Sequence, residues 1–345
     1  MYEAFYGLSS KPFQLNPDPS FYFGSKEHRR AAAYLNYGMH QNEGFIVITG
    51  EVGAGKTTLV RGMLDGLDQD KVVAAHLVST QIDADDTLRL VGAAFGLRTR
   101  DASKADVLMS LEAFLISAAS KGKRCLLIVD EAQNLTARAV EELRMLSNFQ
   151  FGNHALLQSY LVGQPEFRQM LQSPHLMQFR QRVIAACHIG PLDLEETRGY
   201  IEHRLKHAGS SGLPVIGDGA YQAIFKASGG IPRRINALCD RLLLFGFLSS
   251  KKEFDQADVE AVAREIFEET TGASDNNADY APVAAAGDPA SAVAIQRFDQ
   301  RLARLERSLL RLEKINSTAL TLLQQLLANG RTAPAKPIES KKNAA

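Results

Sequence analysis

The chain has 345 residues, of which 45% are hydrophobic, enough for a sizeable buried core and more than one folded unit. Lys plus Arg equals Asp plus Glu at 39 each, and no run of like charge stands out. The overall charge therefore gives no support to a protein that binds nucleic acid or acidic lipid through a strongly basic surface.

Cysteines and hydrophobic segments narrow the class further. Cys125, Cys187 and Cys239 lie far apart in apolar surroundings, without the paired spacing of a zinc or redox site. No N-terminal leader pattern is present, and no stretch approaches the roughly 18 uncharged residues of a membrane span. We therefore expect a soluble cytoplasmic protein with reduced, buried thiols.

Short aliphatic runs alternate with longer segments in which every third or fourth residue is apolar. This pattern predicts alternating strands and helices. Several runs are apolar throughout, so both of their faces should be covered, as in a parallel sheet between layers of helices. We expect an α/β fold whose strands lie at 45–49, 72–78, 125–129, 157–163 and 183–189.

The segment after the first predicted strand reads "GEVGAGKTT" and matches the phosphate-loop pattern. Its glycines allow backbone amides to curl around phosphates, and the helix that follows points its positive end at them. Lys56 would reach the β- and γ-phosphates, and Thr57 would bind Mg²⁺. The predicted ATP-binding residues of this loop are Gly50, Glu51, Val52, Gly53, Ala54, Gly55, Lys56, Thr57 and Thr58.

Two acidic residues follow the apolar run in "LLIVDEAQNL", residues 126–135. With a phosphate loop upstream, Asp130 is placed to hold Mg²⁺, and Glu131 to orient or deprotonate the water that attacks the γ-phosphate. A pair of carboxylates that merely faces solvent becomes a weak alternative, because the rest of a magnesium nucleotide site is already present.

After residue 190 the pattern changes to helices, which predicts a lid domain at 191–269. A small and polar segment at 270–292 predicts a flexible linker. Apolar residues spaced three and four apart then predict a coiled-coil helix at 293–329, with Asn316 at a core position. A single amphipathic helix folded back on the body is the alternative, and a disordered tail is expected at 330–345.

The motifs together resemble a known family. "GEVGAGKTTL", "LLIVDEAQNL", "LVGQPEFRQML" and "GGIPRRIN" occur in the order found in AAA+ ATPases of the general secretion pathway protein A type. The opening "FYGLSSKPFQLNPDPSFYF" resembles that group's first segment. The resemblance covers roughly residues 1–268 and implies an AAA+ αβα domain at 1–190, with a five-stranded parallel sheet that includes the additional strand of that class.

The same resemblance assigns further site residues. Gln164 would be the polar sensor of the γ-phosphate, and Arg233 the second sensor, carried by the lid. Arg180 or Arg182 would reach into the site of a neighbouring subunit, which implies a homo-oligomer. Ordinary ion pairs remain an alternative for both of these arginines.

The purpose of the energy release stays open among three hypotheses. The layout resembles the ATPases associated with exosortase (PEP-CTERM) and exopolysaccharide systems, which implies a membrane-associated protein partner met through the coiled coil. The protein would then lie at the inner face of the membrane without spanning it. A DNA-dependent AAA+ regulator and a slow ATP-dependent interaction switch are the alternatives.

Two other patterns have competing interpretations. The aromatic segment "KPFQLNPDPSFYF" could contact the adenine or pack on the edge of the sheet. His203 and His207 lie four residues apart on a predicted helix, but no acidic residue completes a zinc-protease pattern, so we expect solvated lid histidines.

Overall fold

The structure is a computed structural model that describes residues 2–16, 18–41, 43–78 and 83–271. The predicted linker beyond Thr271, the heptad segment at 293–329 and the tail at 330–345 lie outside the described residues. Among the residues that the structure describes, no helix combines the length and the apolar character needed to cross a membrane.

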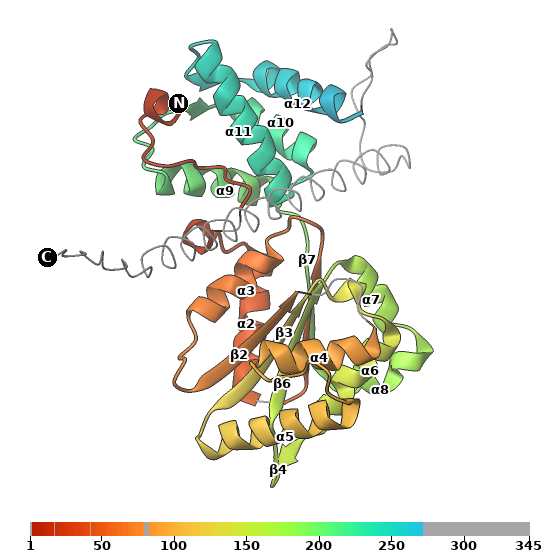
Figure 1. Ribbon diagram of the computed structural model, residues 1–345. Coiled ribbons are helices and arrows are strands. Elements are labelled where there is room, and N and C mark those ends of the chain that lie inside the picture. Colours follow the sequence, from red (N-terminus) through yellow and green to blue (C-terminus); the bar gives the residue numbers. More distant parts are fainter. Residues whose placement is uncertain (1, 17, 42, 79–82, 272–345) are drawn as a thin grey trace, which may run out of the picture. The chain divides into compact units, whose positions relative to one another are not determined.

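A five-stranded parallel sheet forms the centre of the first part of the chain (Figure 1). The strand order is β2-β3-β6-β1-β7, and the predicted α/β fold with a five-stranded parallel sheet is confirmed. All five predicted runs lie in these strands. Their bounds are β1 Phe45–Gly50, β2 Val72–Val78, β3 Arg124–Asp130, β6 Leu157–Gly163 and β7 Val183–Ile189.

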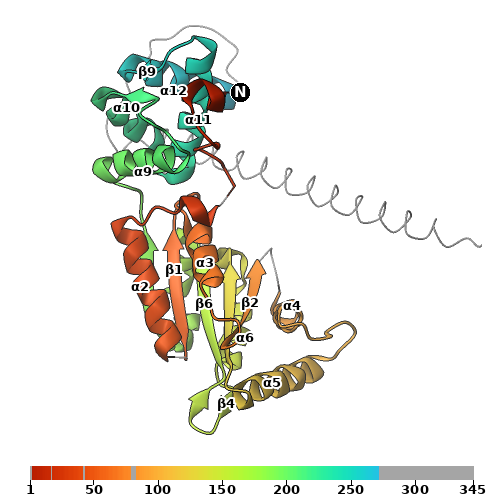
Figure 2. The ribbon, with the colours of Figure 1, turned by 90° about the vertical axis from the view of Figure 1, so that its left-hand side faces the viewer.

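Side chains alternate between the two faces of the sheet, as the twofold period of a strand requires. In β1, Phe45 and Val47 join one hydrophobic cluster, whereas Ile46 and Ile48 join another. Helices α4 (Ala84–Ala94), α5 (Lys104–Ser120) and α6 (Ala137–Leu146) supply much of the first cluster, and α2 (Lys26–Gln41) and α3 (Lys56–Asp65) contribute to the second (Figure 2). Both faces are thus buried along β1, β3 and β6, which explains their apolar character, whereas the edge strands β2 and β7 are partly exposed.

The helices of these two layers differ in length. Their bounds are α2 Lys26–Gln41, α3 Lys56–Asp65, α4 Ala84–Ala94, α5 Lys104–Ser120, α6 Ala137–Leu146, α7 Pro165–Leu171 and α8 Met177–Arg180, with the single turns η2 Ala132–Asn134 and η3 Pro174–Leu176. A short hairpin, β4 Gln150–Phe151 with β5 His154–Ala155, stands outside the central sheet, and its two-residue strands are too short to appear in the sequence pattern.

Parallel strands end at a common edge of the sheet, and that edge gathers the predicted site. Gly163 at the end of β6 is paired with Thr49 near the end of β1, and β3 lies on the other side of β6. The phosphate loop, the tip of β3 and the residue after β6 therefore start from neighbouring strands. This edge is the usual place for ligands in open α/β sheets.

A helical lid follows the last sheet strand. Its elements are α9 Leu194–His207, β8 Val215–Ile216, α10 Asp218–Ser228, α11 Pro232–Leu248, β9 Glu253–Phe254 and α12 Gln256–Thr271. The helix α9 begins with a capping box, in which the side chains of Asp193 and Glu196 each accept the other residue's backbone N–H. Such a cap fixes where the chain leaves the sheet and enters the lid.

The N-terminal segment completes the core of this lid. Tyr2 and Tyr6 of α1 (Tyr2–Tyr6), together with Leu8, Phe13 and Phe21, lie in one cluster with residues of α9, α10, α11 and α12. The predicted domain at 1–190 includes this segment, and that boundary stays a prediction. The five side chains named here enlarge the core that α9 to α12 bury.

Candidate functional site

The phosphate loop joins β1 to α3 and holds its lysine in a buried position. Gly53 and Gly55 have φ angles of 84° and 92°, in the left-handed region that glycine adopts without steric cost. The Nζ atom of Lys56 donates to the carbonyl oxygens of Gly50, at 2.6 Å, and Glu51, at 2.8 Å. Burial lowers the pKa of Lys56, while the carboxylates of Glu131 and Asp130 act in the opposite direction.

Asp130 ends β3 beside this loop and is only 4% exposed. The hydroxyl of Thr57 donates to its Oδ2 atom at 3.1 Å, and the backbone N–H of Glu131 donates to Oδ1 at 2.9 Å. Burial, more than the nearby Glu131, raises the pKa of Asp130. A cation bound beside this carboxylate would stabilise its charged form and lower its pKa.

These two oxygen donors suit Mg²⁺, which binds proteins through one or two oxygen ligands and completes its shell with water and phosphate. Within the described ranges, no group of three or more His, Cys, Asp or Glu side chains could hold a metal ion by itself. A metal at Thr57 and Asp130 would accordingly depend on a phosphate-bearing substrate for its remaining ligands.

Glu131 follows Asp130 with a backbone φ of 56°, which is uncommon for a residue with a side chain. Its Oε2 atom accepts a hydrogen bond from Nε2 of Gln164 at 3.1 Å. The side chain amide of Gln133 donates to the same oxygen. The Oε1 atom of Gln133 accepts the backbone N–H of Gln164 at 3.0 Å, so three residues from two strand ends form one network.

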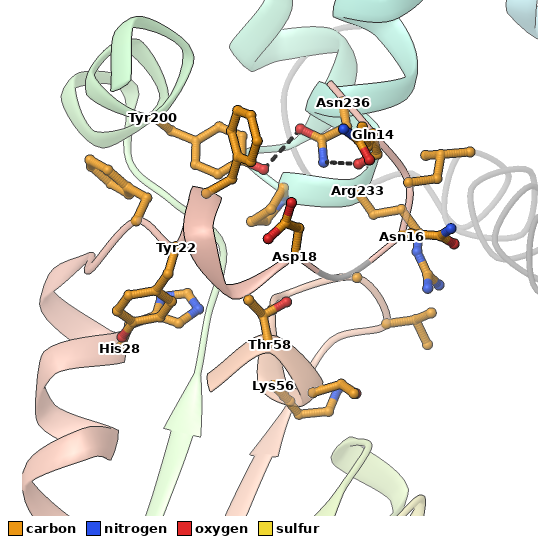
Figure 3. Close-up of a pocket in the computed structure, with 18 of the residues that line it drawn as sticks. Gln14, Asn16, Asp18, Tyr22, His28, Lys56, Thr58, Tyr200, Arg233 and Asn236 are labelled. Carbon is orange, nitrogen blue, oxygen red and sulfur yellow. Dashed lines mark hydrogen bonds between the residues drawn. The ribbon is translucent and has the colours of Figure 1, made fainter. Parts of the chain in front are cut away.

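The lid reaches the phosphate loop through the first turn of α11. The backbone N–H of Arg233 donates to the carbonyl of Gly53 at 3.2 Å. A Cβ atom built on Gly53 would lie 2.5 Å from the Cβ of Arg233, so the two segments are in direct contact. Figure 3 shows Arg233 and Lys56 on the wall of one pocket, which the phosphate loop, Glu131, Gln164, the lid and the N-terminal segment line together.

A buried polar network ties the N-terminal segment to the lid at this pocket (Figure 3). The hydroxyl of Tyr200 donates to Oδ1 of Asn236 at 2.8 Å, and Nδ2 of Asn236 donates to the carbonyl of Gln14 at 3.2 Å. Arg204, 6% exposed, donates to the carbonyl of Pro12 at 2.5 Å and to the Tyr200 hydroxyl at 3.0 Å. Its guanidinium also lies 4.9 Å from the ring centroid of Phe21.

His28, on α2, supports the loop from the other side. Its Nε2 atom lies 2.9 Å from the carbonyl oxygen of Ala54, and its Nδ1 atom lies 2.7 Å from the hydroxyl of Ser25. A carbonyl only accepts, so Nε2 carries the proton and Nδ1 of the neutral ring accepts from Ser25. Burial lowers the pKa of His28, which favours this neutral form.

Most of the predicted site residues meet at this pocket. Gly50, Glu51 and Ala54 do not line it, but their carbonyl groups hold Lys56 or His28. Asp130 is reached through Thr57. The predicted residues that line the pocket are Val52, Gly53, Gly55, Lys56, Thr57, Thr58, Glu131, Gln164 and Arg233.

Arg180 and Arg182 lie elsewhere. Arg180, at the end of α8, donates to the carbonyls of Leu171 and Ser173. Arg182 donates to the carbonyl of Ser147 and the side chain of Asn148. Neither residue lines the pocket of its own chain, and their predicted action on a neighbouring subunit stays a prediction.

Sequence reasoning missed His28, Gln133, Tyr200, Arg204 and Asn236. Gln133 and Asn236 stand inside the quoted motifs, but the sequence does not reveal their roles, because each of the five residues acts through a partner brought close by the fold. The aromatic segment was noticed, and Phe21, Tyr22 and Phe23 of that segment line the pocket. The lid histidines at 203 and 207 stack on each other with centroids 6.2 Å apart, and their rings also contact Phe23 and Phe21 respectively.

Comparisons with known proteins agree with this geometry. Residues 39–171 match a family model described as an AAA domain. The chain is 37% identical over 267 residues to general secretion pathway protein A of Aeromonas hydrophila, a match that covers 77% of this chain and 48% of that protein. The chain thus spans about half the length of this relative.

Solved structures share the fold at low sequence identity. The ORC2 protein of Aeropyrum pernix, in its ADPNP-ADP complexes, has a TM-score of 0.56 and 17% identity, covering 74% of this chain and 72% of that chain. Cdc6p of Pyrobaculum aerophilum has a TM-score of 0.55 and 15% identity, covering 76% and 70%. Together with the phosphate loop and the sheet, these likenesses define the fold. This chain is therefore an AAA domain protein with the P-loop AAA+ fold, homologous to general secretion pathway protein A.

Proposed function

We propose that the protein binds ATP with Mg²⁺ at this pocket and hydrolyses it. The observation that supports the proposal most is the hydrogen bond between Thr57 of the phosphate loop and Asp130 of the strand tip. It joins the segment that would hold phosphates to the segment that would hold the metal. The buried ammonium of Lys56 lies in the same loop, and an AAA domain implies nucleotide binding.

Each residue has a separate task in this proposal. Lys56 exchanges its carbonyl partners for phosphate oxygens, and the backbone N–H groups around Gly53 and Gly55 point at the same anion. Thr57 and Asp130 would hold Mg²⁺, which would supply positive charge against the phosphates when bound. Glu131 orients the attacking water and takes up its proton.

In this proposal the lid changes its position according to which nucleotide is bound. Gln164 senses the γ-phosphate beside Glu131, and the guanidinium of Arg233 does so from the lid. The contact between Gly53 and the first turn of α11 means that any shift of the loop is transmitted to that helix. Closing and opening of the lid would convert hydrolysis into movement.

The movement would serve an envelope-associated secretion or exopolysaccharide system, through assembly of the protein or of a membrane-bound partner. The kinship with general secretion pathway protein A supports a secretion role. The association with an exosortase or exopolysaccharide system rests on the sequence layout described above. Oligomerisation with Arg180 or Arg182 acting on a neighbouring subunit completes the proposal.

The activity is tested by measuring Mg²⁺-dependent phosphate release and ATP affinity for the wild type, Lys56→Ala and Glu131→Gln. We expect the wild type to turn over ATP, Lys56→Ala to lose ATP affinity, and Glu131→Gln to keep affinity while turnover falls by about 100-fold or more. Exposed Lys226→Ala is the matched control and should behave as the wild type. Undiminished turnover in both site variants would refute the assignment.

Action between subunits is tested by mixing inactive variants. Glu131→Gln supplies an intact arginine, and Arg180→Ala or Arg182→Ala supplies an intact Glu131. If one arginine acts on the neighbour, its variant is inactive alone and regains turnover when mixed with Glu131→Gln. Failure of both mixtures to regain activity would remove the proposal that either arginine acts in trans.

A further inference from the structure

Gln133 lies where the tips of β3 and β6 meet, two residues after Glu131. Its side chain makes two hydrogen bonds of opposite sense: Nε2 donates to Oε2 of Glu131, and Oε1 accepts the backbone N–H of Gln164. A Cβ atom built on Gly163 would lie 3.1 Å from Oε1 of Gln133, so the amide sits close against the backbone at the end of β6. The side chain therefore spans the gap between the two strand ends.

The partners determine which way this amide points. A carboxylate oxygen only accepts and a backbone N–H only donates, so the opposite orientation would break both hydrogen bonds. A glutamate at this position could keep the contact with Gln164 but would place a second negative charge against Glu131. An asparagine is one methylene shorter, and a methionine fills similar space without either hydrogen-bonding group. Glutamine offers both the donor and the acceptor that these two partners require.

The two carboxylate oxygens of Glu131 differ in their hydrogen bonds. Oε2 accepts from the amides of both Gln133 and Gln164, whereas Oε1 takes part in neither bond. The carboxylate is thus fixed in rotation, with one oxygen engaged by the protein and the other available for water. Glu131 itself has a positive backbone φ of 56°, which sets the direction in which its side chain leaves the strand tip.

We propose that Gln133 is a positioning residue for hydrolysis, holding Glu131 so that its Oε1 atom orients the attacking water. The inference rests on the proposed ATPase function. In the step it supports, the water oxygen bonds to the γ-phosphorus while the bond to the β–γ bridging oxygen breaks. One water proton passes to Glu131 and then to solvent, and the products are ADP and inorganic phosphate.

A positioning role predicts that a substitution at Gln133 lowers turnover while the affinity for nucleotide stays nearly unchanged. Gln133→Met should lower kcat about tenfold to 100-fold, while the Kd for a slowly hydrolysed ATP analogue with Mg²⁺ stays within about twofold. Gln133→Glu, which preserves the shape, should lose more turnover than Gln133→Met because of the added charge. Gln169→Met, at an exposed position on α7, is the matched control and should leave both values unchanged.

A double-mutant cycle distinguishes this role from a purely structural one. If Gln133 acts through Glu131, adding Gln133→Met to Glu131→Gln should cause no further fall in the residual turnover. An additive loss would overturn the proposal. An undiminished kcat of Gln133→Met or of Gln133→Glu would overturn it too. So would a loss of analogue binding as large as the loss of turnover in either variant. A wild type that binds and hydrolyses nothing would overturn the proposed function as well, whereas an active wild type with an equally active Gln133→Met would overturn this inference alone.

Discussion

The sheet domain and the helical lid contribute to one pocket in different ways. The sheet brings its residues together at the ends of neighbouring strands, and each lies in or next to a short motif. The lid contributes through contacts that are remote in sequence: Asn236 binds Gln14 across 222 positions, and Arg204 binds Pro12 across 192. Most of the candidate site residues therefore come from the sheet domain, while the lid contacts the phosphate loop through Arg233 and the N-terminal segment through Asn236 and Arg204.

The two regions also differ in how their buried polar and charged groups affect stability. The sheet domain buries charged groups that lack an opposite charge in direct contact, since Lys56 binds carbonyls and Asp130 binds a hydroxyl and an N–H. In the lid, the buried guanidinium of Arg204 also binds neutral groups, but it lies in a larger network: it donates to the Pro12 carbonyl and the Tyr200 hydroxyl and lies over the ring of Phe21, and Tyr200 donates to Asn236. Buried charge without a counter-charge destabilises a fold, whereas a satisfied network stabilises it. Asp130→Asn in the sheet domain and Arg204→Met in the lid should consequently change stability in opposite directions.

The largest loss is expected for Arg204→Met. It removes two buried hydrogen bonds and the contact with the ring of Phe21, and should lower the free energy of unfolding by about 3 kcal/mol. Urea unfolding followed by circular dichroism measures it. Exposed Arg198→Met, on the same helix, loses ion pairs to Glu202 and Asp218 and should cost less than about 1 kcal/mol. Equal losses for the two variants would refute the claim that the buried network stabilises the protein more than exposed ion pairs do.

Gly53→Ala tests the junction between the two regions. A side chain there would need a φ of 84° and would contact Arg233, so we expect a loss of about 2 kcal/mol in stability and a tenfold or greater loss of ATP affinity. Gly62→Ala, inside α3 where nothing lies within 4 Å, should instead stabilise by about 0.5 to 1 kcal/mol. An ATP affinity unchanged by Gly53→Ala would refute a functional junction.

Asp130→Asn should stabilise the protein in the absence of nucleotide, by on the order of 1 kcal/mol at pH 7.5, because it removes a buried charge. Burial raises the pKa of Asp130, so the charged form costs the folded state at neutral pH, and that cost disappears as the pH falls through the raised pKa. The advantage of the variant should therefore shrink in acid. Exposed Asp86→Asn is the control, and a less stable Asp130→Asn protein would contradict the account.

The smallest effect at neutral pH is expected for His28→Gln, which keeps a donor for the Ala54 carbonyl and should change stability by a few tenths of a kcal/mol. Burial lowers the pKa of His28, so below its ordinary value of 6.5 the unfolded chain binds a proton that the folded protein does not. The wild type should then lose stability relative to the variant as the pH falls. Thermal unfolding from pH 7.5 to 5.5 measures this, with exposed His40→Gln as control, and parallel curves would contradict it.

The sequence was informative where function depends on neighbours in the chain. The runs at 72–78, 157–163 and 183–189 are strands with those same bounds, because each run is marked by its own aliphatic residues. Lys56, Thr57 and Asp130 could be predicted as site residues because a phosphate loop and a strand tip are local patterns, and Thr57 does contact Asp130. Such motifs specify both conformation and chemistry.

It was uninformative where function depends on pairing across the fold. Gln133 stands in a recognised motif, yet its contact with Gln164 exists only because β3 and β6 are neighbours. Tyr6 and Phe13 pack into the lid because the folded lid offers them an apolar surface. The spacing of residues in the sequence does not predict which surface that is. These contacts belong to tertiary structure and follow from the assembled surfaces.

The most direct test of the central claim is a calorimetric titration of the full chain with ATP, with and without Mg²⁺. The account predicts one nucleotide per chain, bound more tightly with Mg²⁺, and no binding to Lys56→Ala at the same concentrations. Absence of Mg²⁺-dependent ATP binding by the folded wild type, or undiminished binding by Lys56→Ala, would contradict it.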